Sequence, residues 1–271
     1  MRQFLVDAFA SQPFRGNPAC VVEPFDAWPD DAFMQALAME NNQAETAYLL
    51  KTEDPARFGL RWFTPAMEVR LCGHATLASA HALFAEMGND ADILTFDTLS
   101  GPLHVRRLTD RYEMDFPGYM PQPRTRAIPD EITQATGIEP LAVWVGPALI
   151  AQFATEDQVR NLKPDLRALP AYIGSVYDDR HLVVTAPADP GKPYDAVSRL
   201  FAPDMGIDED PATGSMHCML GPLYAMQLNK TVIDFYQAHP RRGADIQAEV
   251  RGDRVLLRGQ ALTVARSQLS L

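Results

Sequence analysis

Short hydrophobic segments separated by turn residues recur along the first half of the chain. Alternating apolar and polar positions predict a β-strand, whereas apolar residues three or four positions apart predict a helix. Six segments have the strand pattern: residues 3–9, 19–22, 46–50, 58–63, 93–96 and 103–106. Two segments have the helical pattern, one following Asp30 as an N-cap and the other running from near Gly73 to Phe84. The pattern predicts an α+β fold.

The second half repeats this style of organisation. Its predicted strands are residues 141–145, 171–177, 181–185, 232–236, 248–251 and 255–257, and its best helix follows Thr213. Between the halves, residues 116–124 combine three prolines with a glycine, a composition typical of a linker. We therefore predict an N-terminal domain of residues 1–118 and a C-terminal domain of residues 119–271, whose last strand can cross back to the first domain.

The two halves also share a short repeat. Phe-Thr-Pro-Ala-Met at residues 63–67 corresponds to Phe-Ala-Pro-Asp-Met at residues 201–205, about half the chain later. After each copy, a polar stretch leads to a glycine, Gly73 or Gly214, that opens an apolar helical segment. Duplication of one ancestral domain is the simplest explanation of this pattern.

Composition narrows the class of protein. The chain has 271 residues, of which 46% are hydrophobic, and a formal net charge of -11, so it can bury a large core but repels nucleic acid and anionic lipid. No segment has the roughly 18 apolar residues of a membrane helix, and residues 1–14 lack the apolar core of a signal peptide. The three cysteines, Cys20, Cys72 and Cys218, are an odd number without a C-x-x-C pair. We expect a soluble, cytoplasmic protein without disulfides.

The two glycine-to-helix junctions, residues 71–76 and 209–215, are candidates for binding an anion. The first N–H groups of a helix are unpaired, and glycine lets a ligand approach them closely. Two such junctions facing one cleft would bind a carboxylate. The alternative is that Asp210, Thr213 and Ser215 merely cap a helix and that His74 is a polar residue near a turn.

Four motifs make a family resemblance specific. They are GNPACVV at residues 16–22, AETAYL at 44–49, FTPAMEVRLCGHATLASA at 63–80 and EDPATGSM at 209–216. In this order and spacing they resemble the PhzF-like isomerases of the phenazine-biosynthesis type. The resemblance implies a fold similar to that of diaminopimelate epimerase, with two pseudo-symmetric α+β domains. In that fold each domain is a curved mixed sheet or barrel around a central helix, and the active site lies in the cleft between the domains.

The resemblance also implies an activity and its residues. Members isomerise a small substrate by moving a carbon-bound proton, as with a dihydro-hydroxyanthranilate in phenazine synthesis, and they need no cofactor. The other histidines have no shared metal-ligand spacing, so we also expect no metal. Glu45 is implied as the general acid/base, assisted by His74 and Asp210. Gly73, Gly214 and Ser215 are implied in substrate binding, and Asn17 is a further candidate contact because the Gly-Asn-Pro turn can present its amide. We expect a small carboxylate-bearing amine or hydroxy acid as substrate, and a homodimer.

Three other interpretations stay open. Without the resemblance, Glu45 would be a solvated residue on a sheet edge, and Asn17 in Gly-Asn-Pro would be part of a turn. Racemases of this fold use two opposed cysteines, and Cys72 has the position of one, which makes a two-base epimerase possible; the corresponding second turn has no thiol, and Cys218 lies one helical turn too late. The scaffold could also be a small-carboxylate-binding module without turnover.

Overall fold

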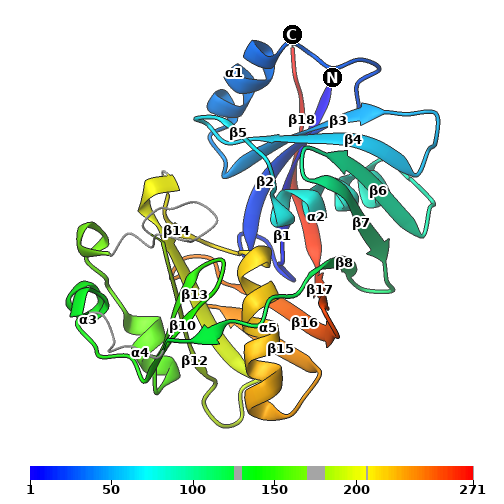
Figure 1. The fold of residues 1–271 in the computed structure, drawn as a ribbon. Coiled ribbons are helices and arrows are strands. Elements are labelled where there is room, and N and C mark those ends of the chain that lie inside the picture. Colours follow the sequence, from blue (N-terminus) through cyan, green and yellow to red (C-terminus); the bar gives the residue numbers. More distant parts are fainter. Residues whose placement is uncertain (125–129, 170–180, 206, 271) are drawn as a thin grey trace. The chain divides into compact units, whose positions relative to one another are not determined.

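Contacts within the chain divide the protein into two compact units. The computed structural model describes residues 1–124, 130–169, 181–205 and 207–270 (Figure 1). Unit 1 contains Met1–Asp115 and Arg258–Leu271, and unit 2 contains Phe116–Leu257. The chain leaves unit 1 within β8 (Tyr112–Pro117) and returns to it within β17 (Arg254–Gly259). The first crossing lies a few residues before the domain boundary predicted at residue 118.

Unit 1 is a mixed sheet with two helices. Its other strands are β1 (Arg2–Ala8), β2 (Asn17–Val22), β3 (Glu45–Lys51), β4 (Arg57–Phe63), β5 (Glu68–Val69), β6 (Ile93–Thr98), β7 (Gly101–Arg107) and β18 (Ala261–Gln268). Strands β18, β1, β2, β3, β4, β6, β7 and β8 pair in that order, and β5 pairs with β4. The β2–β3 and β4–β6 pairs are parallel and the others antiparallel. The last strand therefore completes the sheet of unit 1 beside the first.

Helix α2 (Gly73–His81) is the central helix of unit 1. Every residue after Gly73 is buried, and the helix contacts β1, β2, β3, β7 and β18. Small side chains such as Ala75, Ala78 and Ala80 let it lie close to the surrounding strands. The predicted helix reaches Phe84 only by changing form, since Ala82–Glu86 is a π-helical segment. Burial on all sides fixes the position of the N-terminus of α2.

Helix α1 (Asp31–Asn41) covers a separate hydrophobic cluster of unit 1. Asp30 is its N-cap, as predicted, because its carboxylate accepts a hydrogen bond from the backbone N–H of Ala32 at 2.7 Å. Met34, Leu37 and Ala38 form the buried face and pack in one cluster with Tyr48 and Phe63. The Tyr48 hydroxyl donates to the backbone carbonyl of Met34 at 2.6 Å. This cluster anchors β3, the strand that begins at Glu45.

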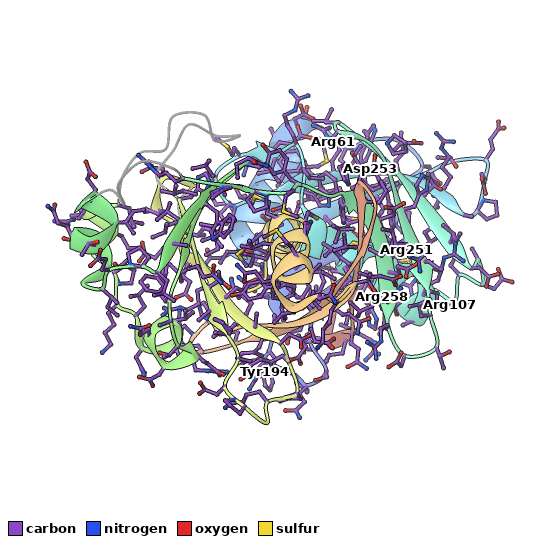
Figure 2. The ribbon with its side chains drawn as sticks, turned by 60° about the horizontal axis from the view of Figure 1, so that its bottom comes forward. Arg61, Arg107, Tyr194, Arg251, Asp253 and Arg258 are labelled. Atoms are coloured by element: carbon purple, nitrogen blue, oxygen red, sulfur yellow. The ribbon has the colours of Figure 1, made fainter. Side chains whose placement is uncertain are left out.

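Unit 2 is a second mixed sheet around a helix. Its remaining strands are β9 (Gln122–Pro123), β10 (Ala142–Val145), β11 (Leu149–Gln152), β12 (Leu182–Pro187), β13 (Ala196–Ala202), β14 (Ile207–Asp210), β15 (Val232–Gln237) and β16 (Ala244–Arg251). Its helices are α3 (Asp130–Thr136), α4 (Glu156–Asn161) and α5 (Gly214–Leu228), with 3-10 turns at Leu166–Ala168 and Pro203–Met205. Strands β9, β10, β11, β12, β13, β15 and β16 pair in that order, and β14 pairs with β13. Figure 2 looks along α5 and shows strands of unit 2 curving around it, with Tyr194 on the β12–β13 connection.

The predicted α+β class is confirmed, but several individual elements differ from those predicted. Residues 116–124 are not a plain linker: β8 extends to Pro117, and Gln122–Pro123 forms β9 against β10. The predicted strand at residues 171–177 lies outside the described residues. Strands β5, β8, β9, β11, β13, β14 and β18 were not predicted. No helix among the described residues is long and apolar enough to cross a membrane.

Candidate active site

Glu45 and His74 are brought together by β3 and α2 of unit 1. Glu45 is the first residue of β3 and pairs in parallel register with Ala19 of β2, whereas His74 is the second residue of α2. The Nε2 atom of His74 lies 2.8 Å from the Oε2 atom of Glu45, and their side chains are 7% and 15% exposed. The interpretation of Glu45 as a solvated residue on a sheet edge is therefore wrong. Its carboxylate lies in a largely buried electrostatic contact.

This contact is close without being a well-directed hydrogen bond. Among the described residues, neither Oε2 of Glu45 nor Nε2 of His74 has a hydrogen-bond partner of good geometry, although the two atoms are within ion-pair distance. The short distance and the missing hydrogen bond are compatible, because Coulombic attraction depends on distance alone, whereas a hydrogen bond also depends on direction. A buried polar atom without a directed partner is costly. Both atoms therefore keep capacity to bind a molecule at this point.

The other ring nitrogen of His74 is held by two buried side chains. The Nδ2 atom of Asn17 lies 3.1 Å from Nδ1 of His74, and the Sγ atom of Cys72 lies 3.5 Å from the same nitrogen. As placed, the amide nitrogen donates to Nδ1 of the neutral ring, whose proton is then on Nε2, toward Glu45. When the ring is protonated both nitrogens carry hydrogen, and the amide oxygen of Asn17 is then the group that can accept from Nδ1. Asn17 has no exposed surface. The structure thus places Asn17 against His74 rather than in an exposed turn.

Gly16 explains how Asn17 reaches this position. Its φ of 62° lies in the left-handed region, and an added Cβ would lie 2.0 Å from the backbone carbonyl oxygen of Ala8. Only glycine permits this close approach between the chain before β2 and the end of β1. Asn17 then begins β2, paired with Ala8. The Gly-Asn-Pro motif is therefore a bend at Gly16 followed by the first two residues of β2, and Asn17 is buried.

The charges around His74 favour its protonated form. Burial lowers the pKa of His74, but Coulombic interactions with Cys72 and Glu45 and hydrogen bonds to both outweigh burial, so the pKa lies well above its usual value. The Cys72 contribution requires a thiolate. Burial, followed by the Glu45 charge, raises the pKa of the Cys72 thiol to about 11, so the thiol is neutral near pH 7. Glu45 is therefore the partner that matters at neutral pH.

Glu45, Cys72 and His74 are also the residues that could hold a metal ion in unit 1. One donor atom from each lies within 4.8 Å of the others, and carboxylate, thiolate and imidazole are all zinc ligands. However, Cys72 lies beside Nδ1 of His74 and Glu45 beside Nε2, on different sides of the ring. One metal ion can take only one of these nitrogens. The arrangement therefore fits polar contacts on the two sides of the ring better than a metal centre.

The second glycine junction lies in unit 2. Asp210 ends β14 and is 8% exposed, and the hydroxyl of Thr213 donates a very short hydrogen bond to its Oδ2 atom. Thr213 occupies the N-cap position of α5 but makes no side-chain cap, and Cys72 likewise makes none at α2. The alternative interpretation of Thr213 as an ordinary cap of α5 is therefore wrong.

The predicted site residues divide between the two units. Asn17, Glu45, Gly73 and His74 belong to unit 1, whereas Asp210, Gly214 and Ser215 belong to unit 2. Ser215 is exposed on the first turn of α5, and Gly214 beside it is buried.

Sequence reasoning missed the residues behind the second turn, Gln237, His217 and Ser198. All three are fully buried. The available signal was a glutamine at an inward position of the alternating strand VIDFYQ.

Comparisons with known proteins place this geometry in a family. The sequence model of the phenazine biosynthesis-like protein family (PhzC-PhzF) matches residues 6–267. An uncharacterized isomerase of Pseudomonas aeruginosa is 42% identical over 271 residues, covering 99% of this chain and 98% of the relative. A PhzF-family protein of Enterococcus faecalis has a crystal structure with a TM-score of 0.91 and 38% identity, covering 100% of this chain and 99% of that one.

A more distant structure shares only the fold. The crystal structure of a probable proline racemase from Agrobacterium radiobacter, with bound carbonate, has a TM-score of 0.61 at 11% identity and covers 100% of this chain and 93% of that one. The expected epimerase-like α+β architecture is confirmed by this likeness and by the PhzF-family structure. With its family model matched over nearly the whole chain and its curated relatives named isomerases, the protein belongs to the phenazine biosynthesis-like family and is an isomerase.

Proposed function

We propose that the protein is a cofactor-independent isomerase that moves a carbon-bound proton on a small carboxylate-bearing substrate through Glu45. The observation that carries the proposal is the 2.8 Å contact between Oε2 of Glu45 and Nε2 of His74, whose atoms keep hydrogen-bonding capacity in a buried setting. A carboxylate in such a place accepts a proton from carbon and, once protonated, returns it to another carbon. One group then serves both transfers.

The proposed step balances without an added redox partner. The Glu45 carboxylate takes the proton, and the electron pair of the broken C–H bond is delocalised into the unsaturated system of the substrate. The same pair then forms the new C–H bond when the carboxylic acid gives its proton back. His74, protonated beside Glu45, stabilises the carboxylate before the first transfer and after the second. No electrons leave the substrate, which is why we propose no cofactor.

We assign substrate binding to the uncapped helix N-termini. In unit 1 the backbone N–H group at Gly73, and in unit 2 those at Gly214 and Ser215, are each suited to carboxylate oxygens, because helix N-termini carry partial positive charge and unpaired donors. Asp210 is assigned to an amine or hydroxyl group of the substrate, with its carboxylate oriented by Thr213. For Asn17 we propose a positioning role on His74, since its amide contacts the ring and is fully buried.

The raised thiol pKa counts against the two-base epimerase. A catalytic cysteine must be available as a thiolate, and the pKa of Cys72 is raised to about 11 by burial and by Glu45. Cys218, the other thiol near a glycine junction, is also buried, which raises its pKa to about 12. Neither supplies a thiolate readily at neutral pH.

The test is proton exchange in heavy water. Wild type, Glu45→Gln and the control Glu53→Gln, which alters an exposed carboxylate of the same unit, are incubated with small amino and hydroxy carboxylates. NMR follows carbon-bound deuterium and any product. Exchange or isomerisation by wild type and Glu53→Gln, but not by Glu45→Gln, supports the proposal. Binding of carboxylates without exchange by any variant would instead indicate a non-catalytic binding module.

We also propose that the protein is a cytoplasmic homodimer. The dimer rests on the family resemblance alone, and the cytoplasmic location rests on the odd number of cysteines without a C-x-x-C pair. Light scattering after size-exclusion chromatography gives the mass directly. A single species of 30.0 kDa would overturn the dimer.

A further inference from the structure

Gln237 holds both ends of the turn that connects Asp210 to α5. Its Oε1 atom accepts a hydrogen bond from the backbone N–H of Thr213 at 2.7 Å. Its Nε2 atom donates to the backbone carbonyl of Asp210 at 2.7 Å and contacts the hydroxyl of Thr213 at 3.2 Å. Gln237 is the last residue of β15 and has no exposed surface. The Gln237 side chain therefore holds the carbonyl of Asp210 and the N–H of Thr213, at the two ends of the turn.

His217 secures the same turn from α5. Its Nδ1 atom lies 2.8 Å from the backbone carbonyl of Thr213, and its Nε2 atom lies 3.2 Å from the hydroxyl of Ser198. A carbonyl only accepts, so the proton is on Nδ1 and Ser198 donates to Nε2. Ser198 and Gln237 are register partners of the parallel β13–β15 pair. The support behind the turn is thus built from one region of the sheet.

These contacts determine which groups of the turn remain for a ligand. The N–H of Thr213 donates to Gln237 and its hydroxyl donates to Asp210, and Thr213 makes no side-chain cap on α5. The carboxylate of Asp210 is held in one orientation by the same hydroxyl. The free donors of the first turn of α5 begin at Gly214. The turn is therefore held by Gln237 and His217.

We propose that Gln237 is a positioning residue for the Asp210–Gly214 turn and thereby sets how tightly the substrate carboxylate and its amine or hydroxyl are held. The inference rests on the proposed function, because it assigns Gln237 to the binding part of that site. Glutamine suits the position because it offers an acceptor and donors on one planar group, and the turn presents both a donor and an acceptor. A buried polar network of this kind is costly if half of it is removed.

The experiment compares Gln237→Met with Gln152→Met. Methionine keeps an unbranched side chain of similar length and removes every hydrogen bond. Gln152 is also buried in unit 2, but it bonds to Gln227 and Trp144, away from the turn. Thr213→Val interrupts the same network at a half-buried position and serves if Gln237→Met fails to fold. Two readouts are taken: amide hydrogen exchange of Thr213 by NMR, and kcat and KM on the carboxylate that shows turnover in heavy water.

For Gln237→Met we expect the Thr213 amide to exchange faster and KM to rise about 10- to 100-fold with a smaller fall in kcat, because a displaced binding group costs about this much. Gln152→Met should change neither readout. Thr213→Val keeps both backbone hydrogen bonds of Gln237 but frees the Asp210 carboxylate, so it should raise KM without speeding amide exchange at position 213. Unchanged amide exchange and unchanged KM in Gln237→Met would overturn the inference. If wild type turns over no carboxylate, the proposed function fails, whereas the amide readout still tests whether Gln237 holds the turn.

Discussion

The side-chain amide of Asn17 contacts the imidazole of His74 on the nitrogen opposite the one that faces Glu45. The distances are 3.1 Å from Nδ2 of Asn17 to Nδ1 and 2.8 Å from Oε2 of Glu45 to Nε2. Because the amide donates to Nδ1, the neutral ring carries its proton on Nε2, where it supports the Glu45 carboxylate. Asn17 therefore influences Glu45 through the His74 ring.

Replacing Asn17 should impair catalysis through His74. In Asn17→Ala the partner of Nδ1 is lost. At a pH above the His74 pKa, where the ring is neutral, we expect both tautomers of His74, together with a fall in kcat of about 10- to 100-fold. Nitrogen-15 NMR of the labelled imidazole reports the tautomer directly. Wild-type spectra combined with wild-type kcat in Asn17→Ala would contradict the positioning role of Asn17.

The pair of His74 and Glu45 should stabilise the protein most at low and neutral pH. The pKa of His74 is raised in the folded state, so the folded protein binds this proton more tightly than the unfolded chain does. The contribution is fully present below the unfolded pKa of about 6.5 and is lost as pH rises through the folded pKa. Urea denaturation of wild type and His74→Asn should give free energies of unfolding whose difference shrinks as pH rises.

A matched variant isolates this effect. His104 is exposed, so His104→Asn should track wild type at every pH. A difference between wild type and His74→Asn that stays constant from pH 5 to pH 9, a range of about four units around neutral, would mean that the ion pair does not form as described.

His217 should act in the opposite direction. Burial lowers its pKa to about 4, despite its hydrogen bond to the carbonyl of Thr213, so the folded protein holds it neutral. The unfolded chain takes up a proton first, and stability is lost as pH falls from about 6.5 to about 4, by roughly 3 kcal/mol over the whole window. In His217→Gln the free energy of unfolding should be lower at pH 7 but fall less steeply over this window. A slope equal to that of wild type would contradict the neutral, buried assignment.

The cysteines should be unreactive in the folded protein. Burial raises the pKa of the thiols of Cys20, Cys72 and Cys218 to about 12, about 11 and about 12, with the Glu45 charge adding to the effect on Cys72. Mass spectrometry after treatment with iodoacetamide near pH 7.5 should show labelling only after unfolding in urea, because the thiolate is the nucleophile. Rapid labelling of Cys72 in the folded state would restore the thiol-based epimerase as a candidate.

The sequence predicted strands in which apolar and polar residues alternate regularly. It missed strands in which they do not alternate. Strand β13 carries Arg199 among apolar residues, which hides the strand pattern. In the structure Arg199 is buried because it forms a bidentate ion pair with Glu209, at 2.7 and 2.9 Å, and donates to the carbonyls of Val159 and Leu162. Those partners are distant in sequence, so no local window could have justified a buried arginine there.

The sequence also predicted the site in part: it identified residues but not the contacts between them. Motifs singled out Glu45 and His74, but only the parallel β2–β3 pair and the buried start of α2 show that their side chains meet. Asn17 was predicted as a substrate contact because Gly-Asn-Pro is typical of a turn, whereas the backbone of Gly16 directs it to His74. Gln237 was not singled out, because its role depends on a turn about two dozen residues earlier in the chain. Long-range polar contacts are what one sequence does not reveal.

The most direct test of the central claim is the rate of carbon-bound hydrogen exchange in heavy water for Glu45→Gln and Cys72→Ala measured side by side with wild type. If Glu45 carries the proton, the rate in Glu45→Gln falls about 10²- to 10⁴-fold, the usual contribution of a general acid/base, while Cys72→Ala stays within about threefold of wild type. Exchange that persists in Glu45→Gln and disappears in Cys72→Ala would contradict the account and move the chemistry to the thiol.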